Sequence, residues 1–394
     1  MSWPIVNLGD VCQKVDYGLT ASAAERIHGP RFLRITDMQD DTVDWDTVPS
    51  CECSEREYDQ NKLAVGDIVF ARTGATTGKS FLIRHLSKPA VFASYLIRVR
   101  PSQSLDPIYL SYFLKSSMYW HQISTMASGA AQPGVNSSKL KELRLPLPPL
   151  PEQKRIAAIL DKADTIRRKR QQAIQLADDF LRAVFLDIFG DSVTNPYGLR
   201  KGSITELAEI ITGNAFKSDD YIGDSVDAVR LCRGTNVLTS YFDWSDTAYW
   251  PKDKLNGLER YLLSSGDVIL AMDRPWISSG LKVCVFPGGE KDTYLVQRVA
   301  RLRPREAALS EYVYSCIKSM AFEAHCCPTE TTVPHISPVE LRSYEVLIPD
   351  TASLLKYNQV VAKVKSAIAG MQEAAMRAGD AFGSMSQKAF TGQL

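Results

Sequence analysis

Residues 73–80 combine glycine, hydroxyl and lysine side chains in a pattern that could bind phosphate. They read Thr-Gly-Ala-Thr-Thr-Gly-Lys-Ser, which is close to the phosphate-binding loop G-x-x-x-x-G-K-[ST]. However, Thr73 stands where that loop needs its first glycine, and Ser80 is followed by a strand-like run instead of a helix. The matching stretch later in the chain, residues 273–282, does not keep the motif. The pattern therefore disfavours a nucleotide-hydrolysing site, and such an enzyme remains the third-ranked alternative.

No other set of residues has the spacing of a catalytic or metal-binding site. Asn195-Pro196-Tyr197 resembles part of the N-P-P-Y box of adenine methyltransferases, but it lacks the second proline and a preceding glycine-rich cofactor loop. The five histidines and eight cysteines do not have zinc-ligand spacing. The sequence has no H-E-x-x-H or G-x-S-x-G motif. We expect no catalytic residue, no metal site and mostly buried, reduced thiols.

The composition is that of an ordinary globular protein. Of 394 residues, 45% are hydrophobic and 23% are charged, and this length predicts two or more domains. No run approaches the roughly 18 apolar residues of a membrane span, and the N-terminus does not have the pattern of a signal peptide. We therefore expect a cytoplasmic protein without a membrane partner. The net charge of +1 neither favours nor disfavours a nucleic-acid partner.

The chain repeats itself at an interval of about 200 residues, far longer than a solenoid repeat. Three segments return later in the sequence: Gly66–Ala71 as Gly266–Ala271, Arg34–Met38 as Arg233–Val237, and Arg98–Pro101 as Arg301–Pro304. This interval predicts two like domains, which can be related by an approximate two-fold axis. A natural target for such an axis is a paired site on duplex DNA.

Each half has short strand-like runs followed by a helix, a loop of small residues and a last strand. Strands are predicted at residues 63–72, 82–83 and 91–99, and at 262–272, 282–286 and 294–302. Helices are predicted at 107–126 and 309–326. This order predicts an α+β fold with two similar α/β domains, residues 1–150 and 191–350.

Two long helices are predicted to separate these domains, over residues 151–190 and 351–394. A stiff proline-rich hinge, residues 146–151, precedes the first. Apolar residues recur at alternating intervals of three and four in both. The first seam is Ile156, Ile159, Ala163, Ile166, Ala173, Ala177, Phe180 and Val184, with Arg170 as its one break, and the second is Val361, Val364, Ile368, Met371, Ala375, Ala378, Phe382, Met385 and Ala389.

We expect these helices to pair as an antiparallel coiled coil that gives the molecule pseudo-two-fold symmetry. The second contains Gly370, Gly379 and Gly383, each of which costs about 1 kcal/mol inside a helix, so it should be packed along its length. At about 38 residues each, the helices greatly exceed the usual 11 to 12. The alternative is that each helix is a core element of its own domain.

The glycine- and hydroxyl-rich loops are the candidate contact sites for DNA phosphates or base edges. The candidates in the first domain are Arg72, Thr76, Lys79, Gln132 and Asn136. Those in the second domain are Arg274, Trp276, Ser278, Thr331 and His335, with Lys282 beside them. A plain hairpin turn is the alternative for each loop. The basic run Arg167–Arg170 is either a solvated helix face or a phosphate contact.

The hinge and the start of the first helix closely resemble the central conserved region of type I restriction-modification specificity (S) subunits. The resemblance lies in residues 145–161, Leu-Pro-Leu-Pro-Pro-Leu-Pro-Glu-Gln-Lys-Arg-Ile-Ala-Ala-Ile-Leu-Asp. The closing Phe-Leu-Asp-Ile-Phe-Gly-Asp of residues 185–191 and the tail Gln-Lys-Ala-Phe-Thr-Gly-Gln-Leu of residues 387–394 are similar to the same family. The second half departs from the pattern, because Pro349-Asp350-Thr351 lacks the P-x-x-E-Q signature.

The resemblance implies a non-catalytic subunit with two target-recognition domains, each reading one half of a bipartite double-stranded DNA target. The helices would set the spacer and dock two methyltransferase (M) subunits, and two restriction (R) subunits would join for cleavage. S-adenosylmethionine would bind to the M subunits and ATP with Mg²⁺ to the R subunits, so this chain would hold no cofactor. The holoenzyme would methylate adenine or cut unmodified DNA. The alternative from another class is a scaffold protein whose coiled coil binds partners.

Overall fold

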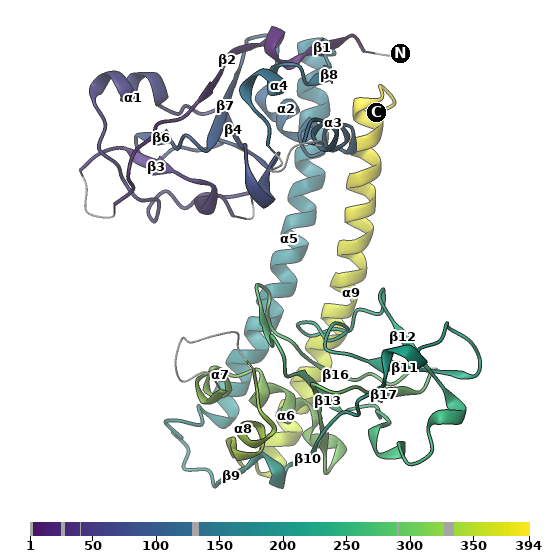
Figure 1. The fold of residues 1–394 in the computed structure, drawn as a ribbon. Helices are drawn as coiled ribbons and strands as arrows, with labels where there is room; N and C mark the ends of the chain where they lie inside the picture. The colour runs from purple at the N-terminus through teal and green to yellow at the C-terminus, as the bar shows by residue number, and fades with distance from the viewer. Residues whose placement is uncertain (1–2, 25–27, 40, 128–133, 290, 327–334) are drawn as a thin grey trace. The chain divides into compact units, whose positions relative to one another are not determined.

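The computed structural model describes residues 3–24, 28–39, 41–127, 134–289, 291–326 and 335–394 (Figure 1). They form two compact units, which we call unit 1 (Met1–Gln172 with Met371–Leu394) and unit 2 (Ala173–Gly370). Two helices of 40 residues each, α5 (Leu150–Phe189) and α9 (Thr351–Phe390), contribute one half to each unit. The division thus passes through both helices, whereas the sequence suggested four consecutive segments, 1–150, 151–190, 191–350 and 351–394.

A four-stranded antiparallel sheet with the order β2-β7-β4-β5 forms the centre of unit 1. A parallel pair, β3–β6, and an antiparallel pair, β1–β8, complete its strands. The strands are β1 (Ile5–Asn7), β2 (Cys12–Tyr17), β3 (Arg31–Leu33), β4 (Ile68–Ala71), β5 (Ser80–Leu82), β6 (Ala90–Phe92), β7 (Leu96–Pro101) and β8 (Arg144–Pro146). The helices are α1 (Glu55–Asn61), α2 (Pro107–Phe113), α3 (Ser117–Ala127) and α4 (Ser137–Lys141).

Unit 2 repeats this topology with the central order β10-β18-β13-β16. A parallel pair, β11–β17, again lies in a second sheet, and β19 pairs with β9. The strands are β9 (Lys201–Ser203), β10 (Ala208–Thr212), β11 (Ala228–Cys232), β12 (Ala248–Pro251), β13 (Val268–Ala271), β14 (Trp276–Ile277), β15 (Gly280–Leu281), β16 (Val283–Val285), β17 (Thr293–Leu295), β18 (Val299–Pro304) and β19 (Glu345–Leu347). The helices are α6 (Ser310–Ile317), α7 (Met320–Cys326) and α8 (Pro338–Ser343). The mixture of helices and strands agrees with the predicted α+β class.

Two features of the predicted elements were wrong in both halves. The helices predicted at 107–126 and 309–326 are each divided in two, because a serine starts a second helix. The Ser116 hydroxyl donates to the Phe113 carbonyl and accepts from the Tyr119 amide, and Ser319 does the same with Cys316 and Phe322. The strands predicted at 91–99 and 294–302 are also divided, by a tight turn that sends their two parts into different sheets.

Two arginines of β7 lie in the repeated segment Arg98–Pro101, and both make ion pairs with an aspartate. Arg98 is fully buried, and its guanidinium donates to the Asp16 carboxylate (Nε–Oδ1 3.0 Å) and to the Lys62 carbonyl (2.7 Å). Arg100 binds the buried Asp67 with two hydrogen bonds of 2.6 Å. A buried guanidinium costs free energy unless its donors are satisfied. The pairs therefore fix the segment that leads into β4 against the sheet.

Unit 2 contains the matching arginine–carboxylate pairs. Arg303 of β18 binds Asp267 with hydrogen bonds of 2.8 and 2.7 Å. Arg301 is buried and donates to Glu209 (2.9 Å) and to the Leu262 carbonyl (3.3 Å). The residues before the two aspartates, Gly66 and Gly266, have φ angles of +93° and +88°, a region that favours glycine. The repeated Gly-Asp and Arg-x-Arg segments are thus structural.

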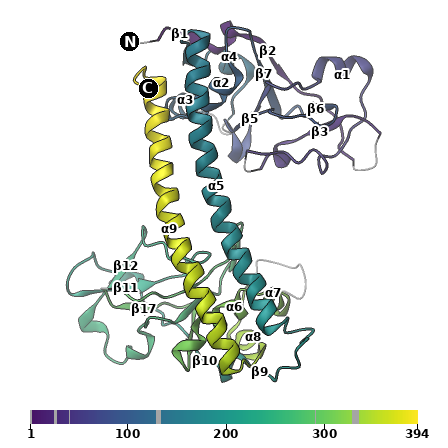
Figure 2. The same ribbon diagram turned by 180° about the vertical axis from the view of Figure 1, so that it is seen from behind.

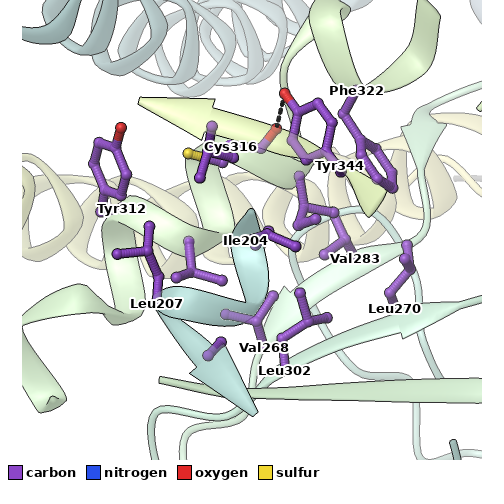
Figure 3. Packing of buried hydrophobic residues seen from close by; sticks show 14 of the residues in the cluster. Ile204, Leu207, Val268, Leu270, Val283, Leu302, Tyr312, Cys316, Phe322 and Tyr344 are labelled. Atoms are coloured by element: carbon purple, nitrogen blue, oxygen red, sulfur yellow. Dashed lines mark hydrogen bonds between the residues drawn. The ribbon is translucent and has the colours of Figure 1, made fainter. Parts of the chain in front are cut away.

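The core of unit 2 lies between its central sheet and the helices that follow it. Figure 3 shows side chains of the sheet facing those of α6, α7 and the residue before β19. The residues labelled there are Ile204, Leu207, Val268, Leu270, Val283, Leu302, Tyr312, Cys316, Phe322 and Tyr344. All are buried, and they belong to one cluster that also includes residues of α5 and α9.

In unit 1 the first half of α5 and the second half of α9 lie side by side and antiparallel (Figures 1 and 2). Near the start of α5, Arg155 donates to the Leu394 carbonyl (2.8 Å), and farther along, the Arg167 guanidinium lies 5.9 Å from the Phe382 ring. Phe390 packs on Tyr109 of α2 at 5.4 Å between ring centres. The helix pair is therefore part of the core of the domain.

The other two halves pack in the same manner in unit 2. Phe189 near the end of α5 lies 4.7 Å from Tyr312 and 5.4 Å from Tyr357, measured between ring centres. Tyr312 of α6 corresponds to Tyr109 of α2, because both donate their hydroxyl to a carbonyl at the last strand of the unit, Leu347 and Pro146.

The seam predicted on α9 agrees with the structure, and the seam predicted on α5 was partly wrong. All nine α9 positions are buried or half-buried. On α5, however, Ile166 and Phe180 are 41% and 52% exposed, while Ala157 and Leu160 are buried. The buried face is rotated relative to the predicted one, because α5 packs on the core of its domain as well as on α9.

Gln153, in the signature that resembles the specificity subunits, attaches α5 to the domain. Its side chain is fully buried, and its amide donates to the carbonyls of Ser104 and Pro148 (both 2.9 Å). Its oxygen accepts from the Asp106 amide (2.8 Å), next to the start of α2. At the start of α9 in unit 2, the buried residue is Leu354, an apolar side chain that cannot make such hydrogen bonds.

Replacing Gln153 with alanine should destabilise unit 1 by about 2–4 kcal/mol, because three buried backbone groups lose their partner. Urea denaturation of the full chain measures this effect. Lys154→Ala, at the exposed neighbouring position, is the matched control and should change the stability by less than about 0.5 kcal/mol. Equal midpoints for the two variants would contradict the attachment.

Candidate nucleic-acid interface

Three segments of unit 1 meet at the end of β4, and they include two of the predicted contact loops. The Arg72 amide donates to the Tyr95 carbonyl in the β6–β7 turn (3.3 Å), and the Arg72 carbonyl accepts from the Val135 amide (2.9 Å). Thr73 and Gly134 form an isolated antiparallel bridge. The loop after β4, the β6–β7 turn and the segment before α4 are therefore held together by backbone hydrogen bonds.

Unit 2 has the same arrangement at the end of β13. The Met272 amide donates to the Arg298 carbonyl (2.9 Å), and the Met272 carbonyl accepts from the Ile336 amide (2.9 Å). Asp273 and His335 form the matching bridge. The backbone frame of the site is thus the same in both units, while the side chains on it differ.

Arg72 and Asn136 lie within this site in unit 1. The Arg72 guanidinium lies 5.1 Å from the centre of the Tyr17 ring. The Tyr17 hydroxyl accepts a hydrogen bond from the Ser137 amide (3.0 Å). Hydrogen bonds with Ser137 and, to a smaller extent, the charge of Arg72 lower the pKa of Tyr17. The Asn136 side-chain oxygen Oδ1 accepts from the Lys139 amide (2.8 Å) and so caps α4.

Tyr17 was not among the predicted contact residues, since it lies outside the loops that were predicted to contact DNA. It is the last residue of β2. The pairing of β2 with β7, and of β7 with β4, brings it near Arg72.

Thr76 and Lys79 line a different feature of unit 1. They border a cleft of about 370 Å³ together with apolar and charged side chains. Its other lining residues are Ile35, Met38, Asp41, Ala71, Ser80, Phe81, Leu114, Lys115 and Trp120. The phosphate-loop pattern is not a phosphate loop here, because Ser80 begins β5 instead of a helix. Gln132 lies outside the described residues.

The predicted contacts of unit 2 have unequal access to solvent. Arg274 and Ser278 are exposed, whereas Trp276 is half-buried against the core. The sequence suggested that Lys282 is a surface cation, but this was wrong. Its side chain is buried, and burial lowers its pKa. Thr331 lies outside the residues that the structure describes.

His335 belongs to a charged cluster around Asp273. Its Nδ1 lies 2.6 Å from one Asp273 carboxylate oxygen, and Arg298 donates to the other at 2.7 Å. Neither Asp273 nor Arg298 was among the predicted contact residues.

The basic run on α5 is mostly engaged within unit 1. Arg167 and Arg168 pair with the buried Asp164 at 2.7 and 3.3 Å. Arg170, the break in the predicted seam, donates to the Ala374 carbonyl of α9. Lys169 is the exposed member of the run. The run is therefore largely part of the helix pairing.

Within the described ranges, no group of three or more His, Cys, Asp or Glu side chains is placed to hold a metal ion. None of the helices in these ranges combines the length and the apolar character that crossing a membrane requires.

Comparisons with known proteins all point to the type I restriction-modification specificity subunits. Residues 2–176 match the family model of the type I restriction modification DNA specificity domain. The chain is 26% identical over 248 residues to the MjaVIII specificity subunit of Methanocaldococcus jannaschii, covering 60% of this chain and 56% of that protein. It is 24% identical over 393 residues to the EcoKI specificity subunit of Escherichia coli K12, covering 92% and 82%. The chain spans about half the length of some curated relatives, 56% of MjaVIII and 50% of the putative MjaX subunit.

Two solved structures share the fold. One is a type I restriction-modification system S subunit from M. genitalium, with a TM-score of 0.52 and 12% identity over 99% of this chain and 96% of that one. The other comes from a study of complex assembly and conformational transition of the type I system, with a TM-score of 0.53 and 17% identity over 100% and 98%. The resemblance noted in the sequence is thus confirmed: residues 2–176 match the type I restriction modification DNA specificity domain, and the chain is similar to curated specificity subunits of type I restriction enzymes.

Proposed function

We propose that this chain recognises a bipartite DNA sequence for a type I restriction-modification complex, with one half-site read by each unit. The observation that carries the proposal is the site at the end of β4 and of β13. The same backbone hydrogen bonds hold the same three segments in both units, while the side chains differ. Like frames with unlike side chains predict a target with two different half-sites.

The complex would contain two methyltransferase (M) subunits and, for cleavage, two restriction (R) subunits. S-adenosylmethionine would bind to the M subunits and ATP with Mg²⁺ to the R subunits, so this chain would need no cofactor. We place M-subunit docking on the helices. Support comes from Leu176 and Phe180, successive-turn residues of α5 that are 67% and 52% exposed, since exposed apolar side chains in a row are typical of partner surfaces.

The helices would also set the distance between the half-sites. Forty residues at about 1.5 Å each span roughly 60 Å, which exceeds one duplex turn of about 34 Å. Antiparallel pairing of the two helices would relate the recognition sites by a pseudo-two-fold axis, as a paired DNA site requires.

Exchanging residues 1–150 for those of a relative of known target should change one half-site and leave the other and the spacer unchanged. The reciprocal exchange of residues 191–350 is the control and should change the other half-site. Maps of methylated adenine in cells that express each hybrid with its methyltransferase subunits give the result. If neither exchange alters the target, the assignment of units to half-sites is wrong.

Inserting four helical residues after Ala173 in α5 and four after Gly370 in α9 should lengthen the pair by about 6 Å. The tolerated spacer should then widen by one or two base pairs, since a base pair rises about 3.4 Å. Methylation of duplexes with graded spacers measures this change. An unchanged spacer preference in a folded, active variant would contradict the ruler role.

Asn136→Ser separates the cap of α4 from DNA contact. Serine caps a helix about as well as asparagine, and Ser337 holds the same position in α8, where it accepts from the Glu340 amide at 3.1 Å. We expect unchanged stability but a roughly ten-fold or greater loss of discrimination at one base pair. Asn136→Ala should in addition cost about 1 kcal/mol of stability. Unaltered discrimination by the serine variant would remove Asn136 from the contact residues.

A further inference from the structure

The tight turn that divides the predicted strands is built identically in the two units. In unit 1 it joins β6 to β7, and the Leu96 amide closes it by donating to the Ala93 carbonyl (2.9 Å). In unit 2 it joins β17 to β18, and Val299 donates to Val296 (3.2 Å). The second residue of each turn donates to the segment just beyond β2 or β10, Ser94 to Leu19 (2.9 Å) and Gln297 to Asn214 (2.8 Å).

A glycine beside each turn confirms how tightly its backbone is held. A Cβ at Gly18 would lie 2.2 Å from the Phe92 carbonyl oxygen, and one at Gly213 would lie 2.2 Å from that of Val296. Real Cβ atoms do not approach so closely. Only glycine therefore fits at these two positions, where the chain lies against the backbone of the turn.

The third residue of each turn differs in chemistry and points its side chain to solvent. It is Tyr95 in unit 1 and Arg298 in unit 2, and these side chains are 63% and 72% exposed. Their carbonyls accept the amide hydrogen bonds from Arg72 and Met272 that define the candidate interface. Each unit therefore carries one arginine at this hydrogen bond, on the donor residue in unit 1 and on the acceptor residue in unit 2.

The surroundings of Arg298 orient its guanidinium and leave some of its N–H donors available for other partners. One oxygen of Asp273 accepts from Arg298 and the other contacts His335, so the carboxylate fixes two potential donors side by side. A guanidinium has five N–H donors in a planar fork, and the exposed donors match the O6 and N7 acceptors of guanine. An exposed tyrosine offers a ring for stacking and a hydroxyl for a base edge or phosphate.

We infer that Tyr95 and Arg298 are equivalent specificity-determining residues that contact bases in the two half-sites, with Asp273 as the positioning residue for Arg298. This inference rests on the proposed function. It adds two residues that lie outside the glycine-rich loops, on a turn whose backbone is fixed and whose side chain varies. A fixed frame supplies a reproducible position, and the variable side chain supplies the sequence preference.

The test compares methylation rates on duplexes that each carry one altered base pair of the target. The full chain is used in complex with its methyltransferase subunits. Arg298→Ala should reduce discrimination roughly ten-fold or more at one base pair of the unit 2 half-site and leave the unit 1 half-site unchanged. Tyr95→Ala should do the converse. Asp273→Asn, which weakens the charged contact, should give a smaller loss at the same base pair as Arg298→Ala.

Arg200→Ala is the matched control, since Arg200 is also an exposed arginine of unit 2 that pairs with a carboxylate, Glu206, at 2.8 Å. It should leave both half-sites unchanged. Unaltered discrimination in the Tyr95 and Arg298 variants, or equal loss at both half-sites, would overturn the inference. A wild-type complex with no sequence preference would instead overturn the proposed function.

Discussion

Each unit depends on an arginine that is buried beside a carboxylate and donates hydrogen bonds both to that carboxylate and to backbone carbonyls. Arg98 in unit 1 and Arg301 in unit 2 join the central sheet to the carbonyls of the segment that leads into it. The neighbouring pairs, Arg100 with Asp67 and Arg303 with Asp267, hold the turn at the start of the next strand. That strand ends at the candidate interface, so these arginine–aspartate pairs help to fix the position of the interface. Removing one partner would leave a buried charge unpaired, which is far more costly than losing an exposed ion pair.

The long helices are part of the cores of both units. Their aromatic residues fill space beside the first helix after the sheet, as Phe390 does on Tyr109 and Phe189 on Tyr312. The attachment of α5 in unit 1 is polar and uses the buried Gln153. A proline–glutamine signature can thus be read physically: the prolines set the direction of the hinge, and the glutamine satisfies the backbone groups that the hinge buries.

Features with a long-range pattern could be predicted from the sequence, and features that depend on one hydrogen bond could not. The repeated Gly-Asp and Arg-x-Arg segments revealed the duplication because buried ion pairs tolerate little change, and heptads located both helices. Periodicity did not reveal that Ser116 starts a new helix or that the chain turns after Ala93. At the site, Arg72 and Asn136 could be found from their glycine- and hydroxyl-rich surroundings. Tyr17, Asp273 and Arg298 could not, because strand pairing and bridges between distant segments bring them there.

The central claim is that one chain reads two unlike DNA sequences with two similar units. The most direct measurement is a genomic map of methylated adenine in cells that express this chain with its methyltransferase subunits. We expect a motif of two different short sequences separated by a spacer of fixed length and no preferred bases. One uninterrupted motif, or two identical half-sites, would contradict it.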